Sequence, residues 1–153
     1  MNLHRKSLSI LVLLIASMLV SGVVVSAQES AVVDALDSFL HDINEQGFYI
    51  VQPNEVDTQM KVRPNLYILD VRTPSEVEEG IIPDAHTIRL SELAKSLDEL
   101  PEGKGTTMYV YCKAGTRAAY AVAALHTLGY TEAYNIAGGF TAWKDQGLPV
   151  ETP

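Results

Sequence analysis

The only cysteine of the 153-residue chain, Cys112, is followed closely by a glycine and an arginine. Together they form the run Cys112, Lys113, Ala114, Gly115, Thr116 and Arg117. Cysteine reacts as a thiolate, which neighbouring cations and backbone N–H groups stabilise. Gly115 favours a tight loop, because a residue without Cβ adopts positive φ and lets a ligand approach the backbone closely. The spacing is therefore suited to a nucleophilic thiol inside a ring of amides.

The alanine-rich stretch after this loop predicts a helix over 117–128. Its apolar residues recur at helical spacing, and Gly129 would end it. A helix start stabilises anions through its unpaired N–H groups and its dipole, whereas a cation such as Arg117 opposes that dipole. An anion held between Arg117 and the helix would explain this placement, and Lys113 adds positive charge. From these residues alone, Cys112 is a reactive thiol, a buried apolar residue or an intermolecular link.

The elements that would position the loop alternate between short apolar runs and helical stretches. Strands are predicted at 48–51, 66–71, 86–90, 108–111 and 133–136. Helices between and after them are predicted at 53–60, 74–79, 91–97, 117–128 and 140–145. The alternation indicates an α/β fold with a mainly parallel central sheet of about five strands and helices on both faces. Ligands of such sheets bind beyond the carboxyl ends of the strands, where Asp70, Arg72 and the Cys112 loop are expected.

The first 27 residues have the features of an export signal. A basic start with Arg5 and Lys6 precedes an apolar run over 8–25, and the ending Val25-Ser26-Ala27 suits cleavage before Gln28. The alternative is an uncleaved membrane anchor, since the run approaches the roughly 18 to 20 apolar residues that span a bilayer. Both alternatives place the rest of the chain in the periplasm or another extracytoplasmic compartment. A membrane is a partner only if the signal segment is uncleaved.

Beyond the signal, residues 28–47 are predicted to hold an N-terminal amphipathic helix over 30–46 that Gly47 ends, and residues 48–150 form one domain. The chain carries 11 Lys+Arg against 19 Asp+Glu, for a formal net charge of −8, which argues against a nucleic-acid partner. The histidines show no ligand spacing with Cys112, so no metal site is predicted. His126 is expected to face solvent from the middle of its helix. Trp143 is expected in the core, next to a close turn at Gly138 and Gly139.

Three separated segments resemble those of the rhodanese-like sulfurtransferases. They are "LDVRTPSEVEEGIIPDAHTI" at 69–88, "VYCKAGTRAA" at 110–119 and "IAGGFTAWKDQGLPV" at 136–150. The resemblance covers about 48–150 and implies a single rhodanese-like domain with Cys112 as the sulfur-accepting nucleophile. It further implies that Lys113 to Arg117 bind the transferred sulfur or the oxyanion of the donor, and that Asp70 and Arg72 brace that loop.

Loop length separates this family from its structural relatives, the dual-specificity phosphatases, in which five residues lie between Cys and Arg. Here four residues intervene, and a tighter ring of amides suits a sulfur atom better than a phosphoryl group with its equatorial oxygens. Three positions depart from the family pattern: Ile81 stands where histidine is usual, Asp84 where glycine is usual, and Ala118 where serine is common. Asp84 is expected to keep a left-handed turn, because Asp tolerates that backbone.

These observations predict an exported thiosulfate-type sulfurtransferase. Cys112 would take sulfane sulfur from a small anionic donor such as thiosulfate, as a persulfide, and pass it to cyanide or a thiol acceptor. No metal or organic cofactor is required for this exchange. The alternative is a non-catalytic binding module of the cell envelope that uses the same fold, in which the thiol is incidental.

Overall fold

Five parallel strands form a single sheet in the order β1-β5-β4-β2-β3. The structure, a computed structural model, describes residues 29–63 and 65–153. The strands are β1 (Ile50–Val51), β2 (Tyr67–Asp70), β3 (His86–Thr87), β4 (Met108–Tyr111) and β5 (Ala133–Ile136). The predicted parallel α/β sheet is thus confirmed. The predicted signal segment, 1–27, lies outside the described residues.

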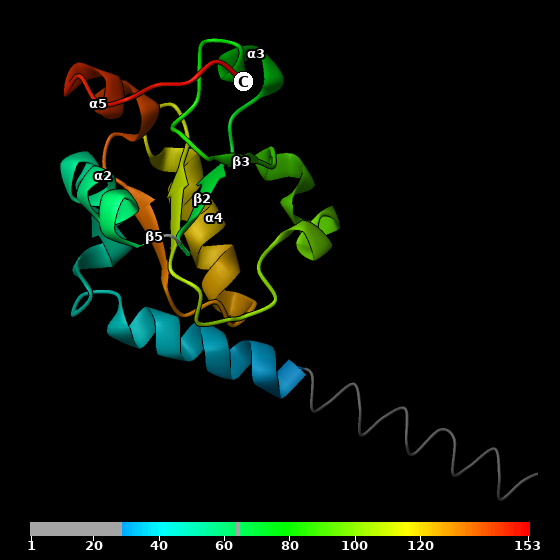
Figure 1. The fold of residues 1–153 in the computed structure, drawn as a ribbon. Helices are drawn as coiled ribbons and strands as arrows, with labels where there is room; N and C mark the ends of the chain where they lie inside the picture. Colours follow the sequence, from blue (N-terminus) through cyan, green and yellow to red (C-terminus); the bar gives the residue numbers. More distant parts are fainter. Residues whose placement is uncertain (1–28, 64) are drawn as a thin grey trace, which may run out of the picture.

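Helices cover both faces of the sheet, as predicted (Figure 1). One face carries α4 (Thr116–Thr127) and the 3-10 helix η2 (Leu90–Lys95), and the other carries α2 (Pro53–Val62) and α5 (Gly139–Asp145). The short helix α3 (Pro74–Val77) follows β2, and a second 3-10 turn, η3 (Leu97–Glu99), follows η2. Every residue of β4 is buried, because its side chains alternate between the two cores. This central strand carries Cys112 at its end.

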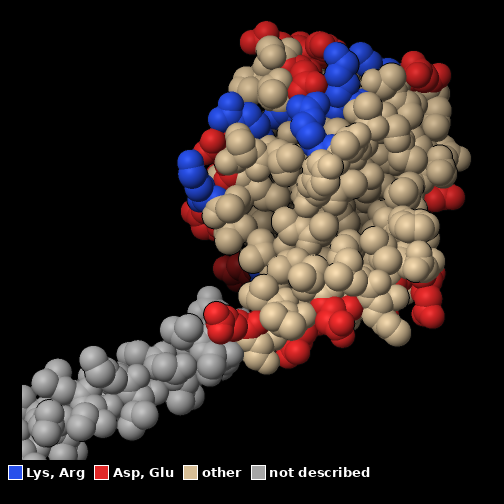
Figure 2. All heavy atoms as spheres, turned by 180° about the vertical axis from the view of Figure 1, so that it is seen from behind, with Lys and Arg blue, Asp and Glu red and all other residues tan. Residues whose placement is uncertain are grey.

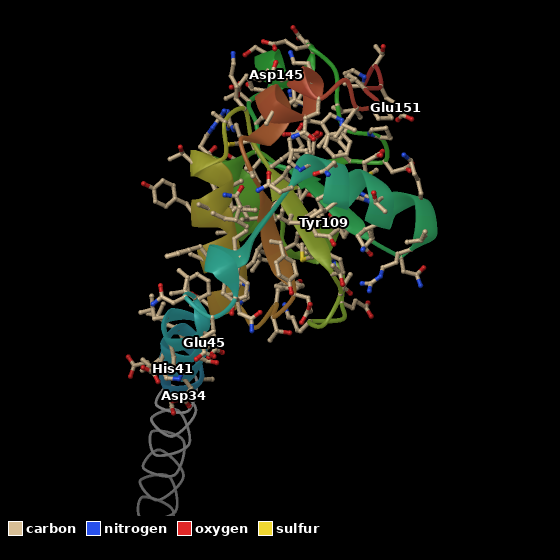
Figure 3. All side chains as sticks on the ribbon, turned by 90° about the vertical axis from the view of Figure 1, so that its left-hand side faces the viewer. Asp34, His41, Glu45, Tyr109, Asp145 and Glu151 are labelled. Carbon is tan, nitrogen blue, oxygen red and sulfur yellow. The ribbon has the colours of Figure 1, made fainter. Side chains whose placement is uncertain are left out.

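The N-terminal helix, residues 29–42, lies at the opposite end of the domain from α3 and α5 (Figure 1). Figure 3 shows Asp34 and His41 on this helix, far from Asp145 and Glu151. Its Phe39 is buried and stacks on Tyr49, with ring centroids 5.3 Å apart. The described residues include no helix that is both long and apolar enough to cross a membrane.

The predicted extension of this helix to residue 46 is wrong, because the chain turns over 43–46 into the 3-10 helix η1 (Gly47–Tyr49). The N–H of Phe48 donates to the carbonyl of Ile43 at 2.7 Å, and Gly47, Phe48 and Tyr49 all have positive φ. This turn of the chain places the ring of Tyr49 against the ring of Phe39. Packing against the domain therefore ends the helix earlier than its amphipathic pattern does.

Three other local predictions differ from the structure. The strand predicted over 86–90 is limited to His86–Thr87, and the helix predicted over 91–97 is 3-10. His126, expected in solvent, is only 7% exposed. Its ring packs against Phe39 and Tyr49, and its Nε2 lies 3.1 Å from the carbonyl oxygen of Ala133. Phe39 of the N-terminal helix, together with Tyr49, covers this position of α4.

Candidate active site

Cys112 lies where two adjacent parallel strands end. Asp70 of β2 is in register with Tyr111 of β4, so the segments that follow both strands leave the sheet at the same edge. Cys112 is 2% exposed, and its Sγ accepts the N–H of Gly115 at 3.2 Å. Gly115 has φ +96° and directly precedes the first residue of α4. The tight loop and the helix start predicted from the sequence are thus present around the thiol.

The start of α5 supports this loop from behind. The N–H of Phe140 donates to the carbonyl of Cys112 at 2.8 Å, and the N–H of Thr141 donates to that of Lys113 at 3.0 Å. A Cβ on Gly139 would overlap the carbonyl oxygen of Cys112 and lie 3.0 Å from the amide nitrogens of Ala114 and Gly115. Sequence reasoning placed Gly139 in the core turn and missed this contact with the loop.

Arg117 projects from the first turn of α4 onto a carboxylate that the sequence analysis also missed. Its Nη1 and Nη2 each donate to Glu76 at 2.7 Å, in a bidentate pair across 41 residues. Glu76 caps α3 as well, since it accepts the backbone N–H and the hydroxyl of Thr73. The pattern Thr-x-x-Glu after a strand is a capping box and could have identified this residue.

The ion pair fixes the charge of both groups. Hydrogen bonding to Arg117 lowers the pKa of Glu76 to about 2, and the bonds to Thr73 act in the same direction. Hydrogen bonding to Glu76 raises the pKa of Arg117, and the neighbouring Cys112 contributes in the same direction. Arg117 is thus a charged group paired with an ionised carboxylate, with the thiol as a neighbour.

Asp70 and Arg72 form a buried ion pair next to the site. The guanidinium donates to Asp70 at 2.6 and 2.9 Å and to the carbonyls of Glu76 and Gly80 at 2.8 and 2.7 Å. It also lies 4.0 Å from the ring centre of Phe140. These contacts reach the thiol loop through Glu76, which holds Arg117, and through Phe140, which binds the carbonyl of Cys112. The loop-bracing role of Asp70 and Arg72 stays a prediction, and the contacts offer an indirect route for it.

The remaining loop residues face outward. Lys113, Ala114 and Thr116 are exposed, and the Nζ of Lys113 lies 4.0 Å from a carboxylate oxygen of Glu79. At the departures from the expected pattern, Asp84 has φ +59°, so the left-handed turn is kept. Ile81 pairs with Glu151 through two backbone hydrogen bonds of 2.8 and 2.9 Å. Asp84 thus keeps the local turn, whereas the backbone pairing of Ile81 does not depend on its side chain.

The fold and the site together define a class of protein. A buried thiol at the carboxyl end of a parallel strand, under a short loop that starts a helix, is a nucleophile site for anionic groups. Residues 52–146 match the rhodanese-like domain family. The chain therefore belongs to the rhodanese-like sulfurtransferase family.

Similar proteins differ in length. A sulfurtransferase of Allochromatium vinosum is 32% identical over 105 residues, which cover 65% of this chain and 96% of that protein. The uncharacterized protein YqhL of Bacillus subtilis is 40% identical over 76 residues, which cover 50% of this chain and 59% of YqhL. The match to slr1261 of Synechocystis covers only 50% of that protein at 34% identity.

Solved structures show the same fold. A rhodanese-like domain protein of Staphylococcus aureus has a TM-score of 0.59 at 30% identity, covering 67% of this chain and 97% of that chain. Alr3790 of Anabaena has a TM-score of 0.62 at 27% identity, with 67% and 82% covered. A Rhodopseudomonas palustris protein described as a possible tyrosine phosphatase has a TM-score of 0.61 at 26% identity, with 78% and 93% covered.

Proposed function

We propose that this chain is a thiosulfate-type sulfurtransferase that carries sulfane sulfur as a Cys112 persulfide. The observation that carries the proposal is the Gly115 amide donating to Sγ inside a loop with four residues between Cys112 and Arg117. The Gly115 N–H is directed at the sulfur, and preorganised donors of this kind stabilise developing negative charge. Thiosulfate, a small anion with a transferable sulfur, fits that environment.

The exchange takes two balanced steps. The Cys112 thiolate attacks the outer sulfur of thiosulfate, an S–S bond forms at Cys112, and sulfite leaves with the electron pair of the broken S–S bond. The acceptor, cyanide or a thiolate, then attacks the outer sulfur of the persulfide. Thiocyanate or an acceptor persulfide forms, and the Cys112 thiolate is regenerated. Neither step needs an added oxidant or reductant.

Intact mass spectrometry tests this proposal directly. After incubation with thiosulfate the protein should gain the mass of one sulfur atom, and cyanide should remove it with release of thiocyanate. The variant Cys112→Ser should gain nothing, because a hydroxyl cannot carry sulfane sulfur. If the parent protein gains no sulfur but hydrolyses a small aryl phosphate, the site is a phosphatase. If it does neither, the chain is a binding module.

We further propose export, on the basis of the basic start, the apolar run and the Val25-Ser26-Ala27 ending. Amino-terminal sequencing of protein recovered from the producing cell should begin at Gln28. Protein that retains Met1 and sediments with membranes would instead support the uncleaved anchor.

A further inference from the structure

A pocket lies beside α4, the helix that follows the thiol loop. It has a volume of about 320 Å³ and lies between α4 and the segment that leads into β1. Its walls are mostly apolar side chains, among them Ile43, Phe48, Ile50, Ala119 and Tyr120. The volume is at the lower end of the range for small-molecule sites, roughly 300–1,000 Å³. It accommodates a molecule of one or two rings.

Asn135 of β5 is the one amide side chain among the residues that line this pocket, and no charged residue lines it. Asn135 is 7% exposed, and its Oδ1 has no hydrogen-bond partner in the described part of the chain. A buried carbonyl oxygen without a donor destabilises a fold, and such atoms call for a specific explanation. This oxygen is itself buried, but the terminal torsion of Asn is broad, so rotation of the amide would turn Oδ1 toward the pocket. The pocket therefore offers one acceptor among apolar walls.

The pocket and the thiol loop share a wall. The Nδ2 of Asn135 is 3.8 Å from the position that a Cβ on Gly115 would take, and Ala119 donates its N–H to the carbonyl of Gly115 at 3.0 Å. Tyr120 at the pocket rim is one turn along α4 from Arg117, about 5 Å on the helix axis. A molecule that fills the pocket lies beside the site where the sulfur is held.

The surface around the pocket is apolar and uncharged. Tyr120 is 67% exposed, and Phe48 and Ile50 are also exposed. Figure 2, which shows the side of the molecule that carries α4, has a broad face without charged side chains, bordered by Lys and Arg above and by Asp and Glu below. The three exposed side chains border a cavity of about 320 Å³, which is the size of a molecule of one or two rings. A small molecule is the occupant that this size favours.

We propose that this pocket binds the ring of a small aromatic acceptor thiol, and that Asn135 accepts a hydrogen bond from an N–H or O–H on that ring. Ring binding is independent of the chemistry at Cys112. The role as an acceptor site rests on the proposed sulfurtransferase function. The ring would be held against α4 while its thiol reaches the persulfide.

Ring binding is tested with two probes of the same size, indole and benzofuran, of which only indole carries a donor. In a ¹H–¹⁵N NMR titration, indole should shift the backbone amides of Ala119, Tyr120 and Asn135, and it should bind about five- to tenfold more tightly than benzofuran. In Asn135→Leu the two probes should bind equally. Tyr120→Ala, at an exposed position that does not endanger folding, should weaken both.

Each alternative gives a different result. If neither probe shifts these amides up to its solubility limit, the pocket holds only water and the proposal fails. If the probes bind the parent equally, no hydrogen bond to Asn135 is made. If the protein without probe self-associates, and raising its concentration shifts the amides of residues 29–42, a second copy of the chain occupies the pocket and the proposal fails.

The acceptor role is tested on the isolated persulfide. The rate of sulfur transfer to 4-mercaptophenol, divided by the rate to cyanide, should fall five- to tenfold in Asn135→Leu and in Tyr120→Ala. It should stay at the parent value in Val62→Ala, a change at an exposed residue of α2. If the persulfide forms but this ratio does not change, the acceptor site is wrong while the sulfurtransferase function holds. If no persulfide forms, that function fails, and the NMR titration still decides ring binding.

Discussion

Gly139 tests whether the start of α5 sets the shape of the thiol loop. Gly139→Ala places a methyl group against the carbonyl oxygen of Cys112 and 3.0 Å from the amide nitrogens of Ala114 and Gly115, where ordinary contacts begin at 3.4 Å. The two nitrogens belong to the thiol loop. The carbonyl is the one that accepts the N–H of Phe140 at the start of α5. The methyl group is accommodated only if the loop moves away from α5.

The expected cost has two parts. Gly139 has φ +58°, so alanine there adopts a left-handed backbone at about 1–2 kcal/mol. Overpacking against the loop adds about 1–3 kcal/mol. Gly147 provides the matched control, because it also has positive φ, +67°, but a Cβ there meets nothing within 4 Å. Gly147→Ala should therefore show the first cost without the second.

The two variants are compared in urea unfolding and in thiosulfate:cyanide transfer. Gly139→Ala should lower the free energy of unfolding by about 1–3 kcal/mol more than Gly147→Ala. Its transfer rate should fall about a hundredfold, since a misplacement on the order of 1 Å costs that much, while Gly147→Ala should retain the parent rate. Equal stability and equal rates in the two variants would refute the claim that α5 shapes the loop.

Three further predictions concern charge, loop size and pH. Glu76→Gln removes the carboxylate charge beside Arg117 but keeps a hydrogen-bond acceptor. The positive charge of Arg117 then attracts thiosulfate more strongly, so the KM for thiosulfate should fall several-fold. An unchanged or raised KM would contradict this electrostatic argument. Inserting one glycine after Ala114 widens the ring of amides, so thiosulfate transfer should be largely lost with little change in melting temperature, and a parent rate would show that loop size does not select the chemistry. Burial lowers the pKa of His126 below its ordinary 6.5, so below that pH the unfolded chain binds more protons and the free energy of unfolding should fall from pH 7 to pH 5. Urea unfolding should show a weaker pH dependence in His126→Gln than in His41→Gln, which changes an exposed histidine; equal slopes would rule out His126 as the source.

The sequence predicts the sheet and the loop well because both depend on local patterns. The apolar runs at 108–111 and 133–136 coincide with β4 and β5, and the helix after Gly115 begins within one residue of its predicted start. A strand buried on both faces needs a continuous apolar run, and a tight turn needs glycine at positive φ. These requirements are visible in short stretches of sequence.

The missed features are contacts between residues far apart in the chain. Arg117 and Glu76 are 41 residues apart, and neither sequence neighbourhood indicates that α3 lies over the start of α4. Gly139 meets the Cys112 loop because β5 and β4 are adjacent, and strand order is not written in any single strand. His126 is buried against Phe39 of the N-terminal helix, a contact that no pattern within α4 indicates. Sequence patterns specify the elements, and their packing completes the site.

The Arg117–Glu76 pair also bears on the choice between sulfur and phosphoryl transfer. A phosphoryl group spreads its charge over equatorial oxygens, and catalysis of its transfer relies on cations free to bind them. In this structure Glu76 occupies both terminal nitrogens of Arg117, and Glu79 lies near Lys113. The buried amide of Gly115 is already directed at the sulfur. Because Arg117 is paired and the Gly115 amide is directed at the sulfur itself, the site favours chemistry at Sγ, which supports sulfur transfer over phosphate ester hydrolysis.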